Sequence, residues 1–376
     1  MTKTARLLRE LVALPSVNPA FLPPGDPRTG EHRVADCLAA MASQAGMDVE
    51  FQKISSERAN LLVTLSPSGK VQRRILLAPH LDTVPSANPE QMVPRLKQGR
   101  LYGRGACDTK GSVAAMFLAM QAMATARRRP KHTEIVFAGL VDEESGQAGS
   151  RALAASGIKA DLAIVGEPTL LEVVTAHKGD IWLRIQTHGK AAHGACPDQG
   201  RNAVHAMARV VDALETEYAA QLRQRTHPLL GHATVNVGRI VGGTQPNIVP
   251  DLCEIAIDRR TLPGETDAGV RREIQTLLRG RGLKVTLSNR KTGTCLPLET
   301  NPRLALVQEL LRAAGRSQSR GVHYFCDASV LALGGIPSVV FGPGNIAQAH
   351  TSDEWISLVE LDKAARILTR FLQVMP

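Results

Sequence analysis

Histidine and acidic residues follow several short apolar segments of the chain, where their side chains could act together. They are His80 and Asp82 in HLD, Asp108 in ACDTKG, Glu143 and Glu144 in DEESG, Glu167 in GEP, and His350 in QAH. Two imidazoles with several carboxylates form a ligand set that suits zinc, cobalt or manganese, and a carboxylate can bridge two cations. A site of this composition favours metal-assisted hydrolysis.

Each of these residues also has a purely structural interpretation. A single histidine or aspartate at the end of a strand is more often a capping or hydrogen-bonding residue than a functional one. Asp82 could cap the turn in LDTVP, and Asp142, Glu143 and Glu144 could form a solvated acidic turn. The joint occurrence of all the polar residues, each beside small residues, is harder to explain by structure alone. We therefore expect one shared site.

The segments that precede these residues predict a sheet covered by helices. RILLAP before His80, TEIVFAGLV before Asp142 and LAIVG before Glu167 have the pattern of buried strands, and residues 110–126 have that of a helix. In an open α/β sheet the ligand site lies beyond the carboxyl ends of the strands. The polar residues should therefore converge on one crevice of an α/β domain.

The middle of the chain has a different pattern. From about Lys178 the expected order is strand, helix (about 202–223), strand, strand, helix (about 267–279) and strand, as in a ferredoxin-like unit. After Thr292 the α/β pattern resumes, with helices expected over 303–314 and 358–372. We predict a discontinuous catalytic domain of residues 1–177 and 293–376, with a helix-covered mixed sheet that binds metal. Residues 178–292 would form an inserted ferredoxin-like α+β domain.

Size and composition limit the alternatives. At 376 residues the chain is longer than one core usually organises, so two domains are expected. The formal net charge is +10, but aromatic residues make up only 3%. The basic residues are scattered, apart from short runs such as Arg127 to Lys131, which argues against nucleic-acid binding.

The expected compartment is the cytoplasm. No apolar stretch approaches the roughly 20 residues that cross a bilayer, and the first residues have the pattern of an amphipathic helix. The six cysteines lie far apart and form no CxxC pair, so we expect neither a disulfide framework nor a thiolate zinc site.

Eight ordered sequence blocks resemble the zinc peptidases and deacylases that include acetylornithine deacetylase, succinyl-diaminopimelate desuccinylase, aminoacylase and the glutamate carboxypeptidases. The blocks are LLAPHLDTVP, YGRGACDTKGSVAA, VDEESGQAGS, IVGEPT, HGKAAHGACPDQGRNA, GGTQPNIVPD, IDRRTLPG and FGPGNIAQAHTSDEWI. They span nearly the whole chain, so the resemblance is specific. It implies two divalent metal ions, zinc first, with cobalt or manganese as alternatives. It also implies a homodimer formed through the inserted domain, which would be the dimerisation (lid) domain.

The resemblance also implies a role for each ligand. His80 and Glu167 would bind one metal ion, Glu144 and His350 would bind the other, and Asp108 would bridge both. Three protein ligands for each ion leave an open position for substrate.

Two further acidic residues, Asp82 and Glu143, have separate roles in this scheme. Asp82 would accept the other imidazole N–H of His80 and so fix its tautomer. Because neighbouring side chains of a strand point to opposite sides, Glu143 and Glu144 should have different roles. Glu144 fits the ligand position, and Glu143 fits the general base that takes a proton from the metal-activated water and delivers it to the leaving amine.

Candidate residues also lie in the inserted domain. In the resembling enzymes the histidine equivalent to His193 reaches across a homodimer and hydrogen-bonds the oxyanion in the neighbouring subunit; a surface or helix-capping histidine is the alternative. Asn247 and Arg260 match positions that hold the carboxylate of the substrate, which a guanidinium can bind bidentately. Arg259 faces the opposite side of the strand, and we expect it at the surface.

Two more features have open interpretations. Gly342, Pro343 and Gly344 form a turn ahead of His350, whose N–H groups could hold a carboxylate or which could be a plain loop. Asp327 falls where relatives often carry an acid that contacts substrate, and a helix N-cap is the alternative.

The expected activity is hydrolysis of the amide bond of an N-acyl amino acid. GPGNIAQAH, and LPG after Arg260, look closest to the acetylornithine deacetylase branch. The alternative is a dipeptidase or carboxypeptidase with the same machinery. A non-catalytic binding protein on this fold is disfavoured because every expected ligand and Glu143 are present. The expected partners are a small N-acyl amino acid or dipeptide and a second copy of the chain, and neither nucleic acid nor a membrane.

Overall fold

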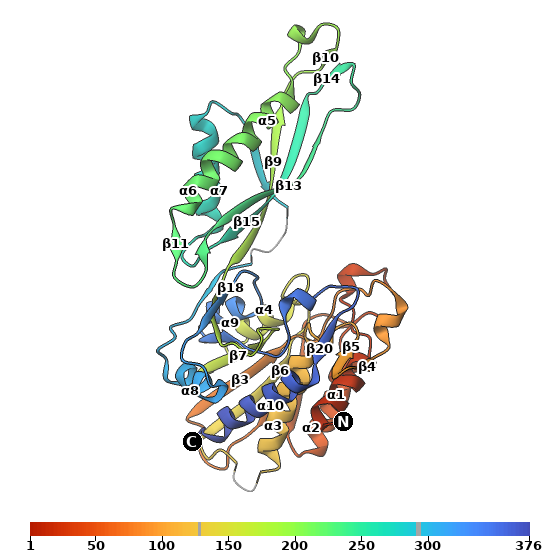
Figure 1. Cartoon of the computed structure of the whole chain (residues 1–376), viewed down its shortest axis with the longest axis vertical. Helices are drawn as coiled ribbons and strands as arrows, with labels where there is room; N and C mark the ends of the chain where they lie inside the picture. Colours follow the sequence, from red (N-terminus) through yellow and green to blue (C-terminus); the bar gives the residue numbers. More distant parts are fainter. Residues whose placement is uncertain (127–128, 291–294) are drawn as a thin grey trace. The chain divides into compact units, whose positions relative to one another are not determined.

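The chain divides into two units in the computed structural model, which describes residues 1–126, 129–290 and 295–376 (Figure 1). Unit 1 comprises Met1–Thr175, Thr300–Arg320 and Cys326–Pro376, and unit 2 comprises Ala176–Glu299 and Gly321–Phe325. Unit 1 is therefore discontinuous in sequence. Two features of the sequence lie outside the described residues. They are the first two residues of the basic run at Arg127 and the predicted domain boundary between residues 292 and 293. The roles expected of the two domains remain predictions.

A mixed sheet forms the centre of unit 1. Its strands lie in the order β1 (Asp48–Lys53), β2 (Ala59–Leu65), β6 (Thr133–Gly139), β3 (Arg73–Pro79), β7 (Leu162–Gly166), β19 (Ser338–Val340) and β8 (Val174–His177). The neighbours β6, β3, β7 and β19 are parallel, whereas β2 and β8 pair antiparallel. Strand β8 continues into unit 2, where it pairs with β17 (Leu298–Glu299), and β18 (Arg320–Val322) also pairs with β8. The central strands are continuous apolar runs because parallel strands are buried on both faces.

Helix α3 (Lys110–Ala124) packs on β3, β6 and β7. It is buried on almost every side, as expected for a helix that is apolar all round. Helices α1 (Lys3–Val12) and α10 (Leu358–Gln373) cover it, and α10 also contacts α8 (Ala305–Ala314). The Lys110 helix and the two helices expected near the C-terminus are therefore present, with small shifts at their ends.

The remaining elements of unit 1 lie around this centre. Helix α2 (His32–Gln44) packs on β1 and β2, α9 (Ala328–Leu333) on β7 and β19, and α4 (Ala148–Ala155) on α9. A small sheet has the order β20 (Trp355–Ser357), β5 (Arg100–Tyr102) and β4 (Arg95–Lys97). Short 3₁₀ helices span Pro19–Phe21, Pro89–Met92 and Ile346–Gln348.

Unit 2 is built on a four-stranded antiparallel sheet. Its order is β13 (Thr234–Gly242), β15 (Leu252–Thr261), β9 (Gly179–His188) and β16 (Thr286–Asn289). Along the chain, β9 is followed by α5 (Ala203–Ala213), β13, β15, α7 (Asp267–Gly280) and β16, which is the ferredoxin-like order. A π-helical turn (Leu214–Tyr218) and α6 (Ala219–Arg223) extend α5.

Shorter elements complete unit 2. Strand β10 (Ala192–His193) pairs with β14 (Ile248–Val249), and β11 (Thr226–His227) pairs with β12 (Gly231–His232). A 3₁₀ helix spans Pro197–Gln199. One apolar core joins α5, α6 and α7 to the sheet.

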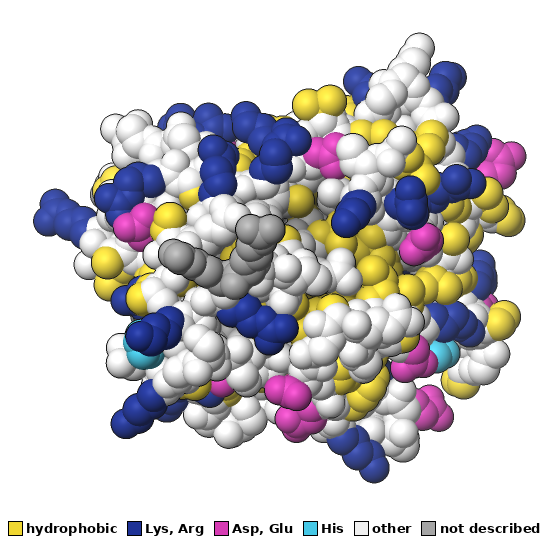
Figure 2. Space-filling view, turned by 90° about the horizontal axis from the view of Figure 1, so that it is seen from below, with side chains coloured by type: hydrophobic (Ala, Val, Ile, Leu, Met, Phe, Trp, Pro, Cys, Tyr) yellow, Lys and Arg dark blue, Asp and Glu magenta, His cyan; other side chains and the backbone are white. Residues whose placement is uncertain are grey.

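Basic side chains are distributed over the face of the molecule that Figure 2 shows. On the face in Figure 2, Lys and Arg side chains are spread between uncharged side chains instead of gathering in one patch. Among the described helices, none has the length and apolar character needed to span a membrane.

Candidate metal centre

The polar residues that follow the parallel strands of unit 1 meet at one edge of its sheet. His80 follows β3, Glu143 and Glu144 follow β6, and Glu167 follows β7, and these three strands are neighbours. Asp108 reaches the same edge from the turn before α3, and His350 from the loop after the 3₁₀ helix Ile346–Gln348. The sheet thus brings together residues that are distant in the sequence.

Two groups of side chains have ligand atoms close enough to share a metal ion. The buried ligand group is His80, Asp108 and Glu167, and the open ligand group is Asp108, Glu144 and His350. Within each group the ligand atoms lie within 4.8 Å of one another. Asp108 belongs to both groups, as a bridging carboxylate would.

His80 is oriented for binding through Nε2. Its Nε2 lies 3.2 Å from Oδ1 of Asp108 and 3.7 Å from Oε1 of Glu167. Its Nδ1 lies 3.0 Å from the main-chain oxygen of Asp82 and 3.4 Å from the Oδ1 atom of that residue. An Nδ1–H held by these acceptors leaves the Nε2 lone pair for a cation. Burial opposes protonation of His80, but hydrogen bonds to Asp108 and Asp82 raise its pKa well above the ordinary value.

The open ligand group has one exposed member. Nε2 of His350 lies 3.1 Å from Oε2 of Glu144 and 3.4 Å from Oδ2 of Asp108, and 55% of the His350 side chain is exposed. Hydrogen bonds to the two carboxylates raise the pKa of His350 to about 10. Oε1 of Glu144 is buried and has no hydrogen-bond partner among the described residues.

The Asp82 carboxylate is hydrogen-bonded to the main chain that carries Glu143 and Glu144. It accepts the main-chain N–H groups of Glu143 and Glu144, each at 3.1 Å, and the side-chain amide of Asn18 at 2.7 Å. Asn18 also donates to Oδ1 of Asp142. Asn18 was not predicted, because a single asparagine in VNP carries no signal of its own, and its partners lie 64 and 124 positions away.

The acidic run after β6 is not a solvated turn. Asp142 is buried and paired with Arg58, whose Nη1 lies 2.9 Å from Oδ1 of Asp142. Glu143 is half-buried, and no hydrogen bond to its carboxylate is found within residues 1–126, 129–290 and 295–376. Burial, with the nearby charge of Glu167, raises the pKa of Glu143 well above its usual value. Such a carboxyl group suits proton transfer.

Asp327 belongs to the same acidic surroundings. It stands at the N-cap position of α9, but its side chain makes no capping hydrogen bond. Instead its Oδ1 accepts from Ser150 Oγ at 2.6 Å. Burial raises the pKa of Asp327 to about 6. The capping alternative therefore does not explain this residue.

The donor set fits divalent cations. Buried carboxylates outnumber imidazoles here, and burial raises the pKa of both Glu144 and Glu167. Ionised carboxylates are costly in such a place unless a cation compensates their charge. Together with the partnerless Glu144 oxygen, this favours metal ions with nitrogen and oxygen ligands.

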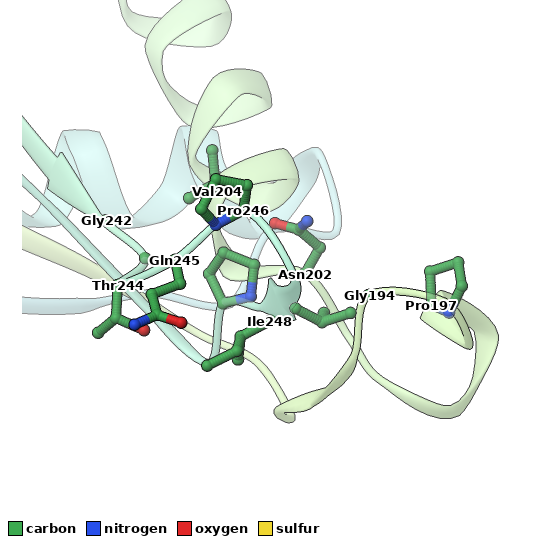
Figure 3. Close-up of a pocket in the computed structure, with 12 residues that line it drawn as sticks. Gly194, Pro197, Asn202, Val204, Gly242, Thr244, Gln245, Pro246 and Ile248 are labelled. Atoms are coloured by element: carbon green, nitrogen blue, oxygen red, sulfur yellow. The ribbon is translucent and has the colours of Figure 1, made fainter.

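His193 and Asn247 lie beside a pocket of unit 2. The pocket has a volume of about 490 Å³, and Figure 3 shows it lined by Gly194, Pro246 and Ile248 among others. His193 pairs with Ile248 across β10 and β14, and Gly194 N–H donates to the Asn247 oxygen at 2.7 Å. Both His193 and Asn247 are exposed.

Of the neighbours Arg259 and Arg260, Arg259 differs from expectation in its burial. Arg260 is half-buried and pairs with both carboxylate oxygens of Asp258, at 2.9 and 3.0 Å. The prediction that Arg259 lies at the surface is wrong, since Arg259 is 0% exposed. It shares the inner face of β15 with Ile257, under the helices, and there it pairs with Glu265 at 2.6 Å and with the Tyr218 hydroxyl.

The Gly342 amide in the turn before His350 already has an acceptor. Gly342 N–H donates to Thr169 Oγ1 at 3.1 Å. Gly344 has a φ of 93°, which glycine tolerates best. Capture of a substrate carboxylate by this turn stays a prediction.

Known proteins resemble this chain in sequence and in fold. The chain is 32% identical over 355 residues to the acetylornithine deacetylase of Myxococcus xanthus, covering 89% of this chain and 90% of the relative. Aminopeptidase PepT from Bacillus cereus has a similar structure, with a TM-score of 0.79, 25% identity and coverage of 99% and 97% of the two chains. A Bacillus subtilis M20 peptidase described as dinuclear and metal binding has a TM-score of 0.71 at 14% identity, covering 99% and 97%.

The profile of peptidase family M20/M25/M40 matches residues 76–374. This range includes every residue of the two ligand groups. The chain therefore belongs to peptidase family M20/M25/M40 and is a metal-dependent amidohydrolase.

Proposed function

We propose that the protein hydrolyses the amide bond of an N-acyl amino acid, as acetylornithine deacetylases do. The observation that carries the proposal is the pair of ligand groups that share Asp108. The 32% identity to the Myxococcus xanthus acetylornithine deacetylase supports the acyl amino acid as substrate.

In this proposal His80 and Glu167 would hold one metal ion, Glu144 and His350 would hold the second, and the Asp108 carboxylate would be available to both. Zinc is the first choice, with cobalt or manganese as alternatives. The ions would lower the pKa of a water molecule from 15.7 towards about 7 and polarise the substrate carbonyl. Asp82 keeps His80 in the tautomer that presents Nε2, and its hydrogen bonds to the main chain of Glu143 and Glu144 hold those residues in place.

Glu143 is the proposed general base. Its carboxylate takes a proton from the attacking water and passes it to the nitrogen of the leaving amine when the C–N bond breaks. Its raised pKa supports this role, because a carboxyl group with a higher pKa accepts a proton more readily near neutral pH.

Unit 2 would complete the site in a homodimer. We assign His193 to the oxyanion, in trans, and Asn247 and Arg260 to the substrate carboxylate. Dimerisation is supported by β13, which is an edge strand of the sheet and exposes Ile240 and Val241. Exposed apolar edge strands are ready to pair with another chain.

Peptide hydrolysis is the second candidate. It is favoured by the similarity to aminopeptidase PepT at 25% identity, and the same residues would cleave a dipeptide by the same steps. The two candidates differ in the groups on either side of the scissile amide.

A hydrolysis screen tests the proposal. The purified protein is incubated with N-acetyl, N-succinyl and N-formyl amino acids and with dipeptides, after chelation and after addition of zinc, cobalt or manganese. We expect amide hydrolysis that is lost on chelation and restored by metal, with N-acetyl amino acids as the best substrates. Full activity in a metal-free sample would contradict the mechanism, and a preference for dipeptides would favour the second candidate.

A further inference from the structure

Glu354 is a buried carboxylate for which the mechanism above has no use. Its side chain has no exposed surface. Oε1 accepts the main-chain N–H groups of Cys107 at 2.8 Å and Asp108 at 3.0 Å. Oε2 accepts the N–H of Gly105 at 3.0 Å and Nη1 of Arg104 at 2.7 Å. One side chain thus organises the loop that carries Asp108.

The shape of this loop depends on these bonds. Main-chain N–H groups that converge on one anion form a nest, and here the Glu354 carboxylate is the anion that the nest binds. Gly105 has a φ of 82°, and a Cβ there would lie 2.8 Å from Thr83 Cγ2, so the turn is tightly packed. Because Asp108 itself donates to Glu354, the carboxylate fixes the main chain from which the Asp108 side chain projects.

Arg104 extends the same network to the loop of His350. The Arg104 side chain is almost fully buried, and its Nη2 donates to the main-chain oxygen of Thr351 at 3.2 Å. Gln91 Nε2 donates to the same oxygen at 2.9 Å. His350 has a φ of 62°, a left-handed conformation that persists only where the surroundings hold it. The bonds to the carbonyl of the next residue provide that support.

We propose that the Arg104–Glu354 pair positions Asp108 and His350 and thereby sets the affinity of the open ligand group for its metal ion. The inference rests on the proposed function, because it takes Asp108 and His350 as ligands. Arg104 and Glu354 are positioning residues, since they act through the main chain of two loops. The orientation of the two loops is the contribution that their hydrogen bonds support, because the presence of a buried ion pair does not by itself indicate added stability.

Glu354→Gln tests the pair. The variant keeps the volume of the side chain but turns an amide NH₂ towards groups that are themselves donors, so hydrogen bonds to the loop are lost. Zinc and cobalt affinities are measured by competition with a chromophoric chelator, together with the absorption spectrum of bound cobalt and the urea midpoint of the metal-free protein. Glu134→Gln is the matched control, because it breaks the Arg74–Glu134 pair at the opposite end of β3 and β6.

We expect Glu354→Gln to bind one of its two ions about 10- to 100-fold more weakly, as is usual when residues behind a ligand are changed. The cobalt spectrum should change. The metal-free protein should unfold at a lower midpoint than Glu134→Gln, because the buried Arg104 loses its counter-charge while the Arg74 side chain is partly exposed. Unchanged metal affinities, with or without a loss of stability, would overturn the inference.

Failure of the proposed function and failure of the variant to fold can each be distinguished from failure of the inference. A wild-type protein that binds no metal pair would overturn the proposed function itself, whatever the variant does. If Glu354→Gln does not fold, Arg104→Lys decides the question, because lysine keeps the charge but cannot reach both Glu354 and the Thr351 oxygen with one planar group. Wild-type metal affinities in Arg104→Lys would then overturn the inference.

Discussion

The two units hold their candidate residues in different ways. In unit 1 the ligand atoms already lie within 4.8 Å of one another, and the His80 imidazole is fixed by hydrogen bonds. In unit 2, His193 and Asn247 are exposed, and Arg260 is paired with Asp258. The difference teaches that the candidate ligand atoms are already close together within one unit. The proposed contacts with the substrate depend on residues of unit 2 that are exposed, such as His193 and Asn247, or paired within their own strand, as Arg260 is.

The buried imidazoles of the two units show the same difference. Burial opposes the charged form of both His80 and His177. The acids around His80 outweigh burial and raise its pKa, whereas the pKa of His177 falls to about 4. The buried His80 of unit 1 is therefore surrounded by acids that favour its charged form, whereas the surroundings of His177 in unit 2 favour the neutral form.

The largest expected effect separates metal binding from proton transfer within unit 1. Glu143→Ala should lower kcat by about 10²- to 10⁴-fold, because the variant loses the general base and no ligand. Its metal content, measured by atomic emission, should stay near that of the wild type. Glu144→Ala is the comparison, and it should lose the ion of the open ligand group. Equal metal loss in both variants would show that the roles of the two glutamates are the reverse.

The next effect concerns the proposed contribution of unit 2. His193→Ala should lower kcat by about 10²- to 10³-fold, the usual loss when one oxyanion donor is removed. Co-expression of His193→Ala with Glu143→Ala should restore about a quarter of wild-type activity if the histidine acts in trans. In a two-fold dimer, half of the random pairs are mixed, and each mixed pair has one intact site. No recovery would count against a shared site.

The sequence predicted that most of the candidate ligands would lie close together, because the ends of apolar strands can be recognised in it. His80, Glu144 and Glu167 each follow an apolar run, and parallel neighbours place such residues together. Asp108 and His350 lie on loops, and it was the resemblance that implied their places as ligands.

What the sequence could not show depends on contacts between distant segments. Asn18 and Glu354 act through partners as far as 124 and 250 positions away, and a single residue type carries no sign of such a contact. Arg259 was placed on the wrong face of β15 because alternation along a strand says which residues share a face. It does not say which face the helices cover.

The smallest expected effect tests the contrast between the buried imidazoles. Nδ1 of His177 lies 2.8 Å from the Lys178 oxygen, and its buried Nε2 has no partner among the described residues, so a second proton there would be unsatisfied. Because the pKa is about 4 in the folded protein, below the ordinary 6.5, the unfolded chain takes up the proton first. The free energy of unfolding should therefore fall as the pH drops below about 6.5, by up to about 3 kcal/mol near pH 4.

The loss is measured by urea unfolding, followed by tryptophan fluorescence between pH 7.5 and 4. In a Trp355→Phe background Trp182 is the remaining tryptophan, and it reports on unit 2. His177→Gln, which cannot titrate, should lose about 3 kcal/mol less than the parent over this range, and identical pH profiles would mean that His177 is protonated as easily in the folded unit as in the unfolded chain.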